Sequence, residues 1–243
     1  MKTVKGIAVS PGVAIGQVLV LHAEELSVAR RSVTERDIPN EKARFEDALT
    51  KTRAELLSIR KQIAQDIGRD HSDIFNAHLL ILEDRTLIEE VILKLKTDKV
   101  NVEYVFSTIV QKYTIAFSHI NDEYLKERTA DIKDVGKRVL ANLLGKPREI
   151  LSKIEEPVIL VSHDLSPPET AIMRKDKIMG FATDIGGPTS HTAIMARSLE
   201  IPAVVGLVDI SQKVANGDTI IIDGNHGLVI ISPDEETIQK YHG

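Results

Sequence analysis

The chain has 243 residues, a formal net charge of −5 at pH 7 and 4% aromatic residues, with neither tryptophan nor cysteine. This length suits one large domain or two small ones, with a core built mainly from aliphatic side chains. The lack of cysteine excludes disulfide bonds and thiolate metal sites, and the mildly acidic charge argues against general nucleic-acid binding. No apolar run approaches the ~20 residues that cross a bilayer, and the sequence shows no signal-peptide pattern, so we expect a cytoplasmic protein.

The first 33 residues and those that follow differ in periodicity. Residues 4–21 are expected to form two strands joined by a turn at Ser10-Pro11-Gly12, because β-branched and aliphatic residues flank that turn. From about Thr34 the pattern becomes helical, since apolar side chains recur every three or four residues. The first such stripe consists of Phe45, Leu49, Thr52, Leu56, Ile59 and Ile63.

Further amphipathic segments follow directly, which favours an intramolecular helical bundle over a coiled-coil dimer. These helices are predicted after a cap at Ser72, near 86–97, near 102–119, and from about Asp122 to a stop at Gly145 and Pro147.

Beyond Pro147 strands and helices alternate, which predicts an α/β layer. Strands are expected near 158–161, 178–182, 203–205, 219–222 and 228–231, and helices near 166–174 and 191–199. A glycine-rich turn between a strand and a helix is the place where such layers bind anions.

The run GGPTSHTAIMARS occupies that turn and contains the best candidate for a chemical role. Gly186 and Gly187 let the backbone come close to a ligand. Thr189 or Ser190 is placed to cap the helix, whose free N–H groups attract an anion. His191 then has the placement that a phosphoryl acceptor needs. By residue type alone, an ordinary turn before a helix fits the same run.

The segment TDIGGPTSHTAIMARSLEIPAVVG, residues 183–206, resembles the phosphohistidine segment of Enzyme I of the bacterial phosphoenolpyruvate:sugar phosphotransferase system. The resemblance extends to GIAVSPGVAIG near the start, to HLLILED at 78–84, and to NDEYLKER at 121–128 with GKR at 136–138. These segments occur in family order and extend over nearly the whole chain. Pro188 departs from the pattern, because Arg or Lys is more often expected there.

The resemblance implies a mixed α+β and α/β architecture. A discontinuous swivelling phosphohistidine α/β domain, residues 1–33 plus 146–232, is expected to contain an inserted all-α helical bundle, residues 34–145. Ser232 followed by Pro, Asp and Glu has the pattern of a helix start, with the serine as cap. Residues 233–243 are therefore expected to begin a linker helix to a C-terminal phosphoenolpyruvate-binding barrel that lies outside this sequence.

The resemblance also implies a function, namely phosphoryl transfer from phosphoenolpyruvate through a phosphohistidine at His191 to a histidine of the carrier protein HPr, the first step of sugar phosphotransferase uptake. Thr170 matches the family threonine that hydrogen-bonds the active histidine. The bundle is expected to dock HPr, although its residues fit core packing equally well by periodicity alone. The residues expected at that docking surface are Asp70, Phe75, His78, Leu79, Leu82 and Arg128.

No cofactor or metal is expected in this part of the protein, because the sequence has no His-x-x-x-His pair and no Gly-x-x-x-x-Gly-Lys loop. Magnesium is expected in the C-terminal domain. HPr and that domain are the expected partners, with neither nucleic acid nor membrane. The chain is expected to be a monomer and the full-length protein a homodimer. Arg197 is expected in a structural ion pair, because it does not share the helix face of His191.

Two other functions are compatible with the residues. Pyruvate phosphate dikinase and phosphoenolpyruvate synthase have similar phosphohistidine segments in a swivelling domain, and the inserted bundle argues against them. The chain is also compatible with a non-catalytic helical adaptor in which His191 is incidental. Binding of HPr distinguishes the first alternative, and a His191→Ala variant distinguishes the second. The sequence leaves open whether the system serves sugar uptake or the nitrogen branch.

Overall fold

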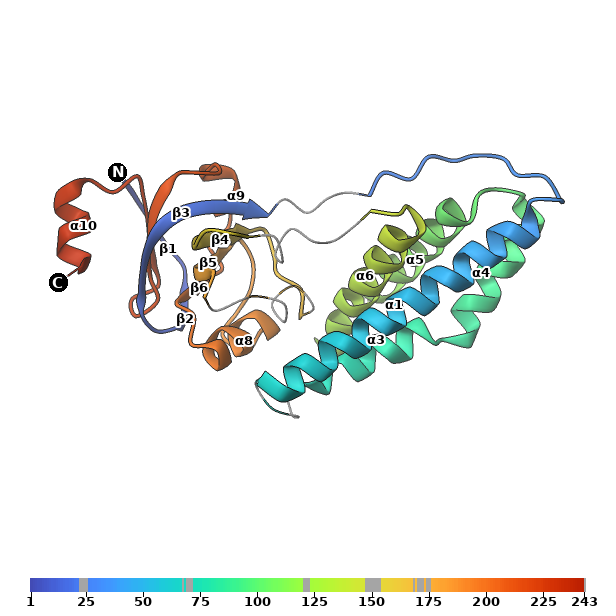
Figure 1. The fold of residues 1–243 in the computed structure, drawn as a ribbon, viewed down its shortest axis with the longest axis horizontal. Helices are drawn as coiled ribbons and strands as arrows, with labels where there is room; N and C mark the ends of the chain where they lie inside the picture. The colour runs from blue at the N-terminus through green and yellow to red at the C-terminus, as the bar shows by residue number, and fades with distance from the viewer. Residues whose placement is uncertain are drawn as a thin grey trace. The chain divides into compact units, whose positions relative to one another are not determined.

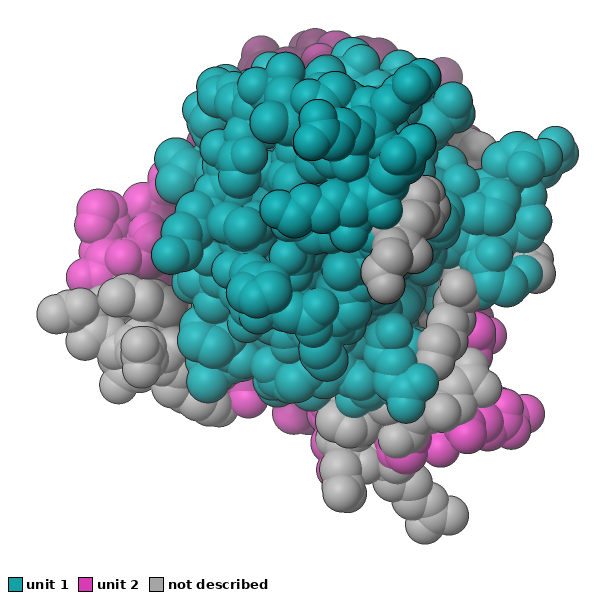
Figure 2. Space-filling model, turned by 90° about the vertical axis from the view of Figure 1, so that its left-hand side faces the viewer, with its two compact units in different colours: residues 1–24, 149–243 teal, residues 25–148 magenta. Residues whose placement is uncertain are grey.

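The computed structural model divides into two compact units, which Figure 2 shows in teal and magenta. Residues 1–24 and 149–243 form an α/β unit, and residues 25–148 form a helical unit. The structure describes residues 1–21, 26–66, 68, 72–119, 123–146, 154–167, 169, 173 and 176–242. No described helix is both long and apolar enough to span a bilayer.

In the residues that the structure describes, the α/β unit is built on an eight-stranded sheet with the order β1-β8-β7-β3-β4-β5-β6-β2. The strands are β1 (Lys2–Lys5), β2 (Ile7–Ser10), β3 (Val13–Leu21), β4 (Val158–Ser162), β5 (Ile178–Thr183), β6 (Ala203–Val205), β7 (Thr219–Asp223) and β8 (Leu228–Ile231). Strands β3, β4, β5 and β6 pair in parallel, and the pairs β1–β8, β8–β7, β7–β3 and β6–β2 are antiparallel. The N-terminal strands therefore complete a layer that is formed mainly by the second half of the chain, as expected.

Both faces of the parallel strands are buried, because side chains alternate between two apolar clusters. In β4, Ile159 belongs to the cluster that includes Ile210 of helix α9 (Ile210–Lys213). Leu160 belongs to the opposite cluster, which includes Ala193 of helix α8 (His191–Leu199). Because β4 and β5 pair in parallel, their carboxyl ends meet at one edge of the sheet, where the loops that follow them lie together.

The helical unit confirms the predicted bundle. Helices α1, α5 and α6 run alongside one another, and α3 packs against α1 and α6 (Figure 1). The helices are α1 (Ile38–Asp66), α3 (Ile74–Leu82), α4 (Arg85–Asp98), α5 (Val102–Ser118) and α6 (Glu123–Leu143). In the first predicted stripe, Leu49 is half-buried and the other five residues are buried.

Two helix starts differ from the prediction. Asp73, and not Ser72, is the N-cap residue of α3. At the end of the chain, α10 (Glu235–His242) is capped by Asp234, whose Oδ1 accepts from the Thr237 amide at 2.9 Å. Ser232 has φ +50° and its amide bonds to the Thr219 carbonyl, so it belongs to the turn after β8. In both cases an aspartate a little further along takes the cap position.

The segment before α1 joins the helical unit, although the sequence analysis assigned residues 1–33 to the α/β domain. The Arg31 amide donates to Asn101 Oδ1 at 2.7 Å, and the Val33 amide donates to the Lys99 carbonyl at 2.9 Å. These bonds tie residues 31–33 to the junction between α4 and α5, which explains why the contact boundary lies earlier in the chain than predicted.

Candidate functional site: the loop before helix α8

The loop between β5 and α8 depends on glycine at its first bend. Gly186 has φ +123°, a conformation that residues with a Cβ rarely adopt. A Cβ built there would also lie 3.2 Å from Val205 Cβ, so the loop passes tightly over β6. Around Gly187 a Cβ would meet no atom within 4 Å. Close backbone approach within the fold therefore explains Gly186 but not Gly187.

Ser190 is the N-cap of α8, one of the two caps that the sequence allowed. Its Oγ accepts from the Ala193 amide at 3.2 Å and donates to the Gly187 carbonyl at 2.8 Å. Thr189 is exposed. The cap closes the loop onto the helix and leaves the amides of His191 and Thr192 without intrahelical acceptors, because helix geometry provides none for the first turn.

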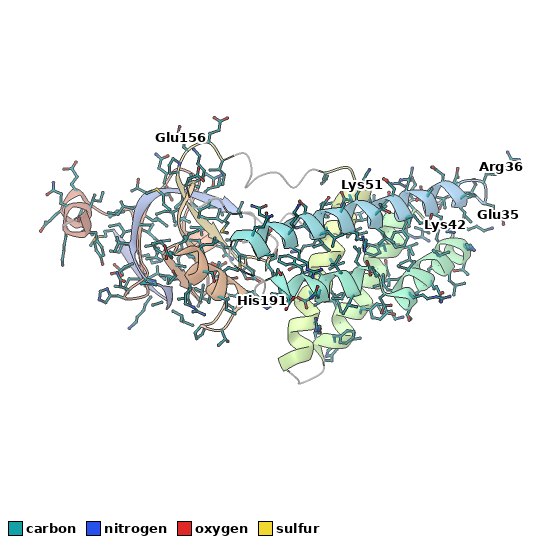
Figure 3. All side chains as sticks on the ribbon, turned by 60° about the horizontal axis from the view of Figure 1, so that its bottom comes forward. Glu35, Arg36, Lys42, Lys51, Glu156 and His191 are labelled. Atoms are coloured by element: carbon teal, nitrogen blue, oxygen red, sulfur yellow. The ribbon has the colours of Figure 1, made fainter. Side chains whose placement is uncertain are left out.

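His191 is the first residue of α8 and is half-buried (Figure 3). The next residue anchors the helix, because the buried Thr192 hydroxyl donates to the Leu165 carbonyl at 2.9 Å. His191 thus stands at the positive end of a helix dipole, on a backbone fixed from both sides. Such a position favours binding of a phosphoryl oxygen beside the ring.

Arg197 binds main-chain carbonyls and not the expected acidic partner. Its Nη1 and Nη2 each lie 3.2 Å from the Pro188 carbonyl oxygen, and Nη1 lies 3.3 Å from that of Val9. The guanidinium therefore fixes the loop from the far end of α8, which fits the expectation of a structural role with a different kind of acceptor.

A buried carboxylate that no sequence motif indicated lies immediately before this loop. Asp184 is 2% exposed and follows β5 directly. Its oxygens accept from the Ser211 amide at 2.8 Å, from the Ser211 hydroxyl at 2.5 Å and from His163 Nδ1 at 3.0 Å. Strand ends at the carboxyl edge were a usable signal, because His163 and Asp184 follow adjacent parallel strands.

Three of the residues predicted to bind a partner are buried in the bundle. Phe75 and His78 are each 1% exposed and Leu82 is 3% exposed. His78 Nδ1 lies 3.2 Å from the Ile74 carbonyl, and its Nε2 faces the carboxylates of Asp131 and Asp134 at 3.9 and 3.8 Å. For these three side chains the partner-binding prediction is wrong, because they face the other helices of the bundle.

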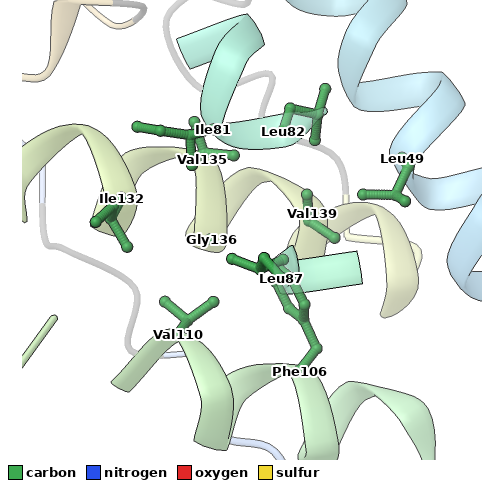
Figure 4. Close-up of a pocket in the computed structure, with 10 residues that line it drawn as sticks. All are labelled: Leu49, Ile81, Leu82, Leu87, Phe106, Val110, Ile132, Val135, Gly136 and Val139. Carbon is green, nitrogen blue, oxygen red and sulfur yellow. The ribbon is translucent and has the colours of Figure 1, made fainter. Parts of the chain in front are cut away.

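Leu82 lines a small apolar cavity in the bundle core, together with residues of α1, α4, α5 and α6 (Figure 4). Gly136 of α6 also lines it. A Cβ at Gly136 would lie 2.6 Å from Val110 Cγ1 of α5, so glycine allows these two helices to approach closely. The cavity is part of the core and has no polar side chain in its lining that would orient a ligand.

The other predicted docking residues have different surroundings. Leu79 is half-buried, and Arg128 is half-buried with its Nη1 3.2 Å from Asp131 Oδ2. Asp70 and Thr170 lie outside the described residues. Leu80, which the sequence analysis did not select, is 71% exposed on α3. This large exposed leucine next to Leu79 is an apolar surface residue that the predicted set of docking residues left out.

Among the described residues, no group of three or more His, Asp and Glu side chains is arranged to hold a metal ion.

Comparison with known proteins identifies matches in both units. Residues 5–128 match the family model of the PEP-utilising enzyme N-terminal domain, and residues 154–227 match that of the PEP-utilising enzyme mobile domain. The chain is 45% identical over 240 residues to the phosphoenolpyruvate-protein phosphotransferase of Bacillus sp. (strain S), and 43% identical over 241 residues to that of Bacillus subtilis (strain 168). Each alignment covers 99% of this chain but only 41% and 42% of these relatives, so the chain spans about two fifths of their length.

Two solved structures have a similar fold. A solution NMR structure of an Enzyme I protein superposes with a TM-score of 0.79 at 43% identity, covering 98% of this chain and 96% of that one. The N-terminal domain of a nitrogen-type Enzyme I gives a TM-score of 0.65 at 27% identity, with 98% of each chain covered.

The chain therefore belongs to the PEP-utilising enzymes. Within that class it is a member of the phosphoenolpyruvate-protein phosphotransferase (Enzyme I) family and corresponds to the N-terminal part of those proteins, which confirms the resemblance found in the sequence.

Proposed function

We propose that the chain carries the phosphoryl-transfer step of a phosphoenolpyruvate-protein phosphotransferase, with His191 as the residue that is phosphorylated. The main support for this proposal is the position of His191, which is the first residue of α8 and directly follows a serine cap and a double-glycine loop. The relatives named phosphoenolpyruvate-protein phosphotransferase support the reaction class.

The reaction consists of two nucleophilic displacements at phosphorus. A ring nitrogen of His191, Nε2 by the resemblance, attacks the phosphorus of phosphoenolpyruvate. The bond from phosphorus to the enol oxygen breaks, and the enolate takes a proton to become pyruvate. A histidine nitrogen of HPr then attacks the same phosphorus, and the phosphorus–nitrogen bond to His191 breaks. Such transfers need in-line geometry and charge stabilisation more than a strong base.

The loop provides part of that stabilisation in this proposal. Amides at the start of α8 donate to phosphoryl oxygens, and the hydroxyl of Thr189 is an additional donor on the exposed side of the loop. Thr170 stays a predicted hydrogen-bond partner of the histidine. Because Pro188 stands where a cation is more often expected, the loop itself contributes no charged side chain between Gly186 and Ser190.

For the partner we propose that HPr docks on the helical unit over the outward side of α3. Leu80 and Leu79 give this surface an apolar centre, and Glu83, which is exposed and pairs with Arg53 at 2.6 Å, adds polar groups at the end of the helix. Apolar anchors with a polar rim are the usual composition of a docking surface. Arg128 of α6 stays a predicted contact.

The remaining expectations concern the longer protein. Phosphoenolpyruvate and magnesium are proposed to bind a C-terminal domain of the kind implied by the resemblance, and full-length protein is proposed to dimerise. The relatives are more than twice as long as this chain, which supports a further domain in proteins of this family.

The test is transfer of radiolabelled phosphate from phospho-HPr to the chain and to its His191→Ala variant. Acid-labile, alkali-stable label is expected on the parent and none on the variant. A His119→Ala variant is the control. That histidine is the C-cap residue of α5 in the other unit, so the variant should still accept the label. Absence of label from the parent would refute HPr as partner and favour the synthase-type domain; label on the His191→Ala variant would refute His191 as the acceptor.

A further inference from the structure

Asp184 joins three segments at the carboxyl edge of the sheet. Its side chain accepts from His163, which follows β4, and twice from Ser211 of α9. Its main chain continues the ladder, because its amide donates to the Ser162 carbonyl at 3.2 Å and its carbonyl accepts from the Val208 amide at 2.8 Å. All of these bonds hold Asp184, which lies two residues before Gly186 and directly before the loop that leads to His191.

His163 is oriented by this carboxylate. A carboxylate only accepts, so the hydrogen of the 3.0 Å bond belongs to His163 Nδ1. The side chain is otherwise 61% exposed, while that of Asp184 is 1% exposed. An exposed imidazole that donates to a fully buried acid shields that acid from water and completes its hydrogen bonding.

The segment that begins with His163 contacts the loop on one side and α8 on the other. The Ile185 amide donates to the His163 carbonyl at 3.1 Å. Two residues later, the Leu165 carbonyl accepts the Thr192 hydroxyl, next to His191. Residues 163–165 therefore hold the segment 185–192 by hydrogen bonds at both of its ends.

The backbone is strained at Val208, whose amide is bonded to Asp184. Val208 has φ +74°, which is costly for a β-branched residue, and its amide is bonded to the Asp184 carbonyl. Such conformations persist only where surrounding contacts determine them. The main-chain carbonyl of Asp184 is one of those contacts, and the side chain of the same residue is held by Ser211 and His163.

We propose that His163 and Asp184 are a positioning pair for phosphoryl transfer, which holds the loop 185–190 and thereby the ring of His191 in the geometry of attack. This inference rests on the proposed function. The side chain of His163 acts through its Nδ1 hydrogen bond, and it does not touch the phosphoryl group in this role.

The chain contains a matched control for this pair. His226 Nδ1 donates to Asp223 Oδ2 at 2.8 Å, its side chain is 74% exposed, and the carboxylate is buried. This second pair closes the turn between β7 and β8 and has no bond to the loop before α8 among those that the structure describes. Removal of either imidazole thus deprives a buried carboxylate of one donor, but only His163 is bonded to residues at the start of the loop before α8.

The experiment compares the variants His163→Ala, His163→Asn and His226→Ala. The asparagine amide offers a donor near the place of Nδ1, so it tests the hydrogen bond without the ring. Transfer of label is measured in single turnovers as a function of the concentration of phospho-HPr. Exchange of the Gly186 and Gly187 amides and the ring ¹⁵N shifts of His191 are measured by NMR without phosphate.

For His163→Ala we expect the rate at saturating phospho-HPr to fall about 10- to 100-fold, as misplacement of a reacting group does. The half-saturating concentration should stay unchanged, because docking uses the other unit. The loop amides should exchange faster and the His191 shifts should move. His163→Asn should recover most of the rate, and His226→Ala should match the parent in every readout.

Equal rates for His163→Ala and His226→Ala would overturn the proposal, and so would failure of His163→Asn to restore the rate. If the parent accepts no label from phospho-HPr, the proposed function fails, and the NMR measurements alone decide about positioning. Loop exchange and His191 shifts that respond equally to both alanine variants would then refute it.

Discussion

The two glycines before His191 differ in what a side chain would meet, although the sequence treats them alike. Gly186→Ala places a Cβ at φ +123° and 3.2 Å from Val205 Cβ, whereas Gly187→Ala meets no atom within 4 Å. We expect Gly186→Ala to cost about 1–3 kcal/mol of stability through backbone strain and to slow label transfer to His191. Gly187→Ala should stay near the parent in stability. Thermal unfolding followed by circular dichroism measures the stability of both variants, and the label assay measures their transfer rates. Equal stability losses would show that the loop conformation does not require glycine at position 186 in particular.

The pKa of the Asp223 carboxyl group is lowered in the folded protein. Burial alone would raise this pKa, but hydrogen bonds from His226 and from the Asn225 amide outweigh it and lower the pKa below its ordinary value of 3.8. Tyr241 of α10 also lies against the carboxylate, and burial together with Asp223 raises the pKa of its phenol. A carboxyl group that binds its proton less readily when folded stabilises the fold above its unfolded pKa, and this contribution is lost as the pH falls through the folded value.

The Asp223→Asn variant should therefore lose about 1–3 kcal/mol at pH 7, the usual penalty for a disturbed buried hydrogen-bond group. The difference from the parent should shrink as the pH is lowered below about 4. Urea unfolding followed by the amide signals of the α/β unit measures it at each pH. The exposed Glu236→Gln change on α10 is the control. A difference between Asp223→Asn and the parent that stays constant from pH 7 to 3 would contradict the assigned cause.

The residues of the site differ in how far the sequence could reveal them. Ser190 and His191 act within a few positions of one another, so motif and spacing were enough to place them in a helix start. The partners of Asp184 are 21 and 27 residues away in the chain, and only the pairing of β4 with β5 and the position of α9 bring them together. Arg197 likewise finds its carbonyl acceptors through folding, because Val9 lies 188 positions earlier.

At the scale of helices, the close approach of α5 and α6 depends on Gly136. Alanine would favour the helix by up to about 1 kcal/mol, but its Cβ would lie 2.6 Å from Val110 Cγ1. Overpacking in a core costs about 1–3 kcal/mol, so we expect Gly136→Ala to destabilise the bundle. Val110→Ala should relieve the clash in the double variant. Thermal unfolding of the two single variants and the double variant tests this, and additive losses would contradict it.

Local pattern was enough to predict the helices but not the orientation of α3. Long helices such as α1 alternate apolar and charged residues, so their periodicity selects the buried face. In α3, six of the nine residues Ile74–Leu82 are large apolar side chains (Ile, Phe and Leu), and no stripe stands out against a polar face. Contacts with α1 and α6 decide that Phe75, His78 and Leu82 point inward and that Leu80 stays outside.

For the whole molecule, periodicity showed where the helical insertion begins but not which unit holds the segment before it. Residues 26–33 form no regular helix or strand and offer no pattern to assign. Their place follows from Asn101, whose side-chain oxygen accepts from the Arg31 amide and whose Nδ2 donates to the Ala29 carbonyl at 3.1 Å. A long-range bond to one asparagine cannot be anticipated from composition.

If HPr docks over the outward side of α3, Leu80→Ala should weaken binding of HPr to the chain by about tenfold, as loss of an apolar anchor of 1–2 kcal/mol does. The fold should be unaffected, because this side chain is 71% exposed. Isothermal titration with unphosphorylated HPr measures the affinity, and thermal unfolding measures the fold.

Leu82→Ala provides the contrast two residues further along the same helix. Because Leu82 is buried and lines the core cavity, its truncation should cost about 2–5 kcal/mol of stability. Below its melting temperature, where the bundle is still folded, its affinity for HPr should stay near that of the parent. Unchanged affinity in Leu80→Ala would move the docking surface elsewhere on the helical unit. Since the label assay on His191 does not depend on which surface binds the carrier, the two results separate an error in the docking surface from an error in the chemistry.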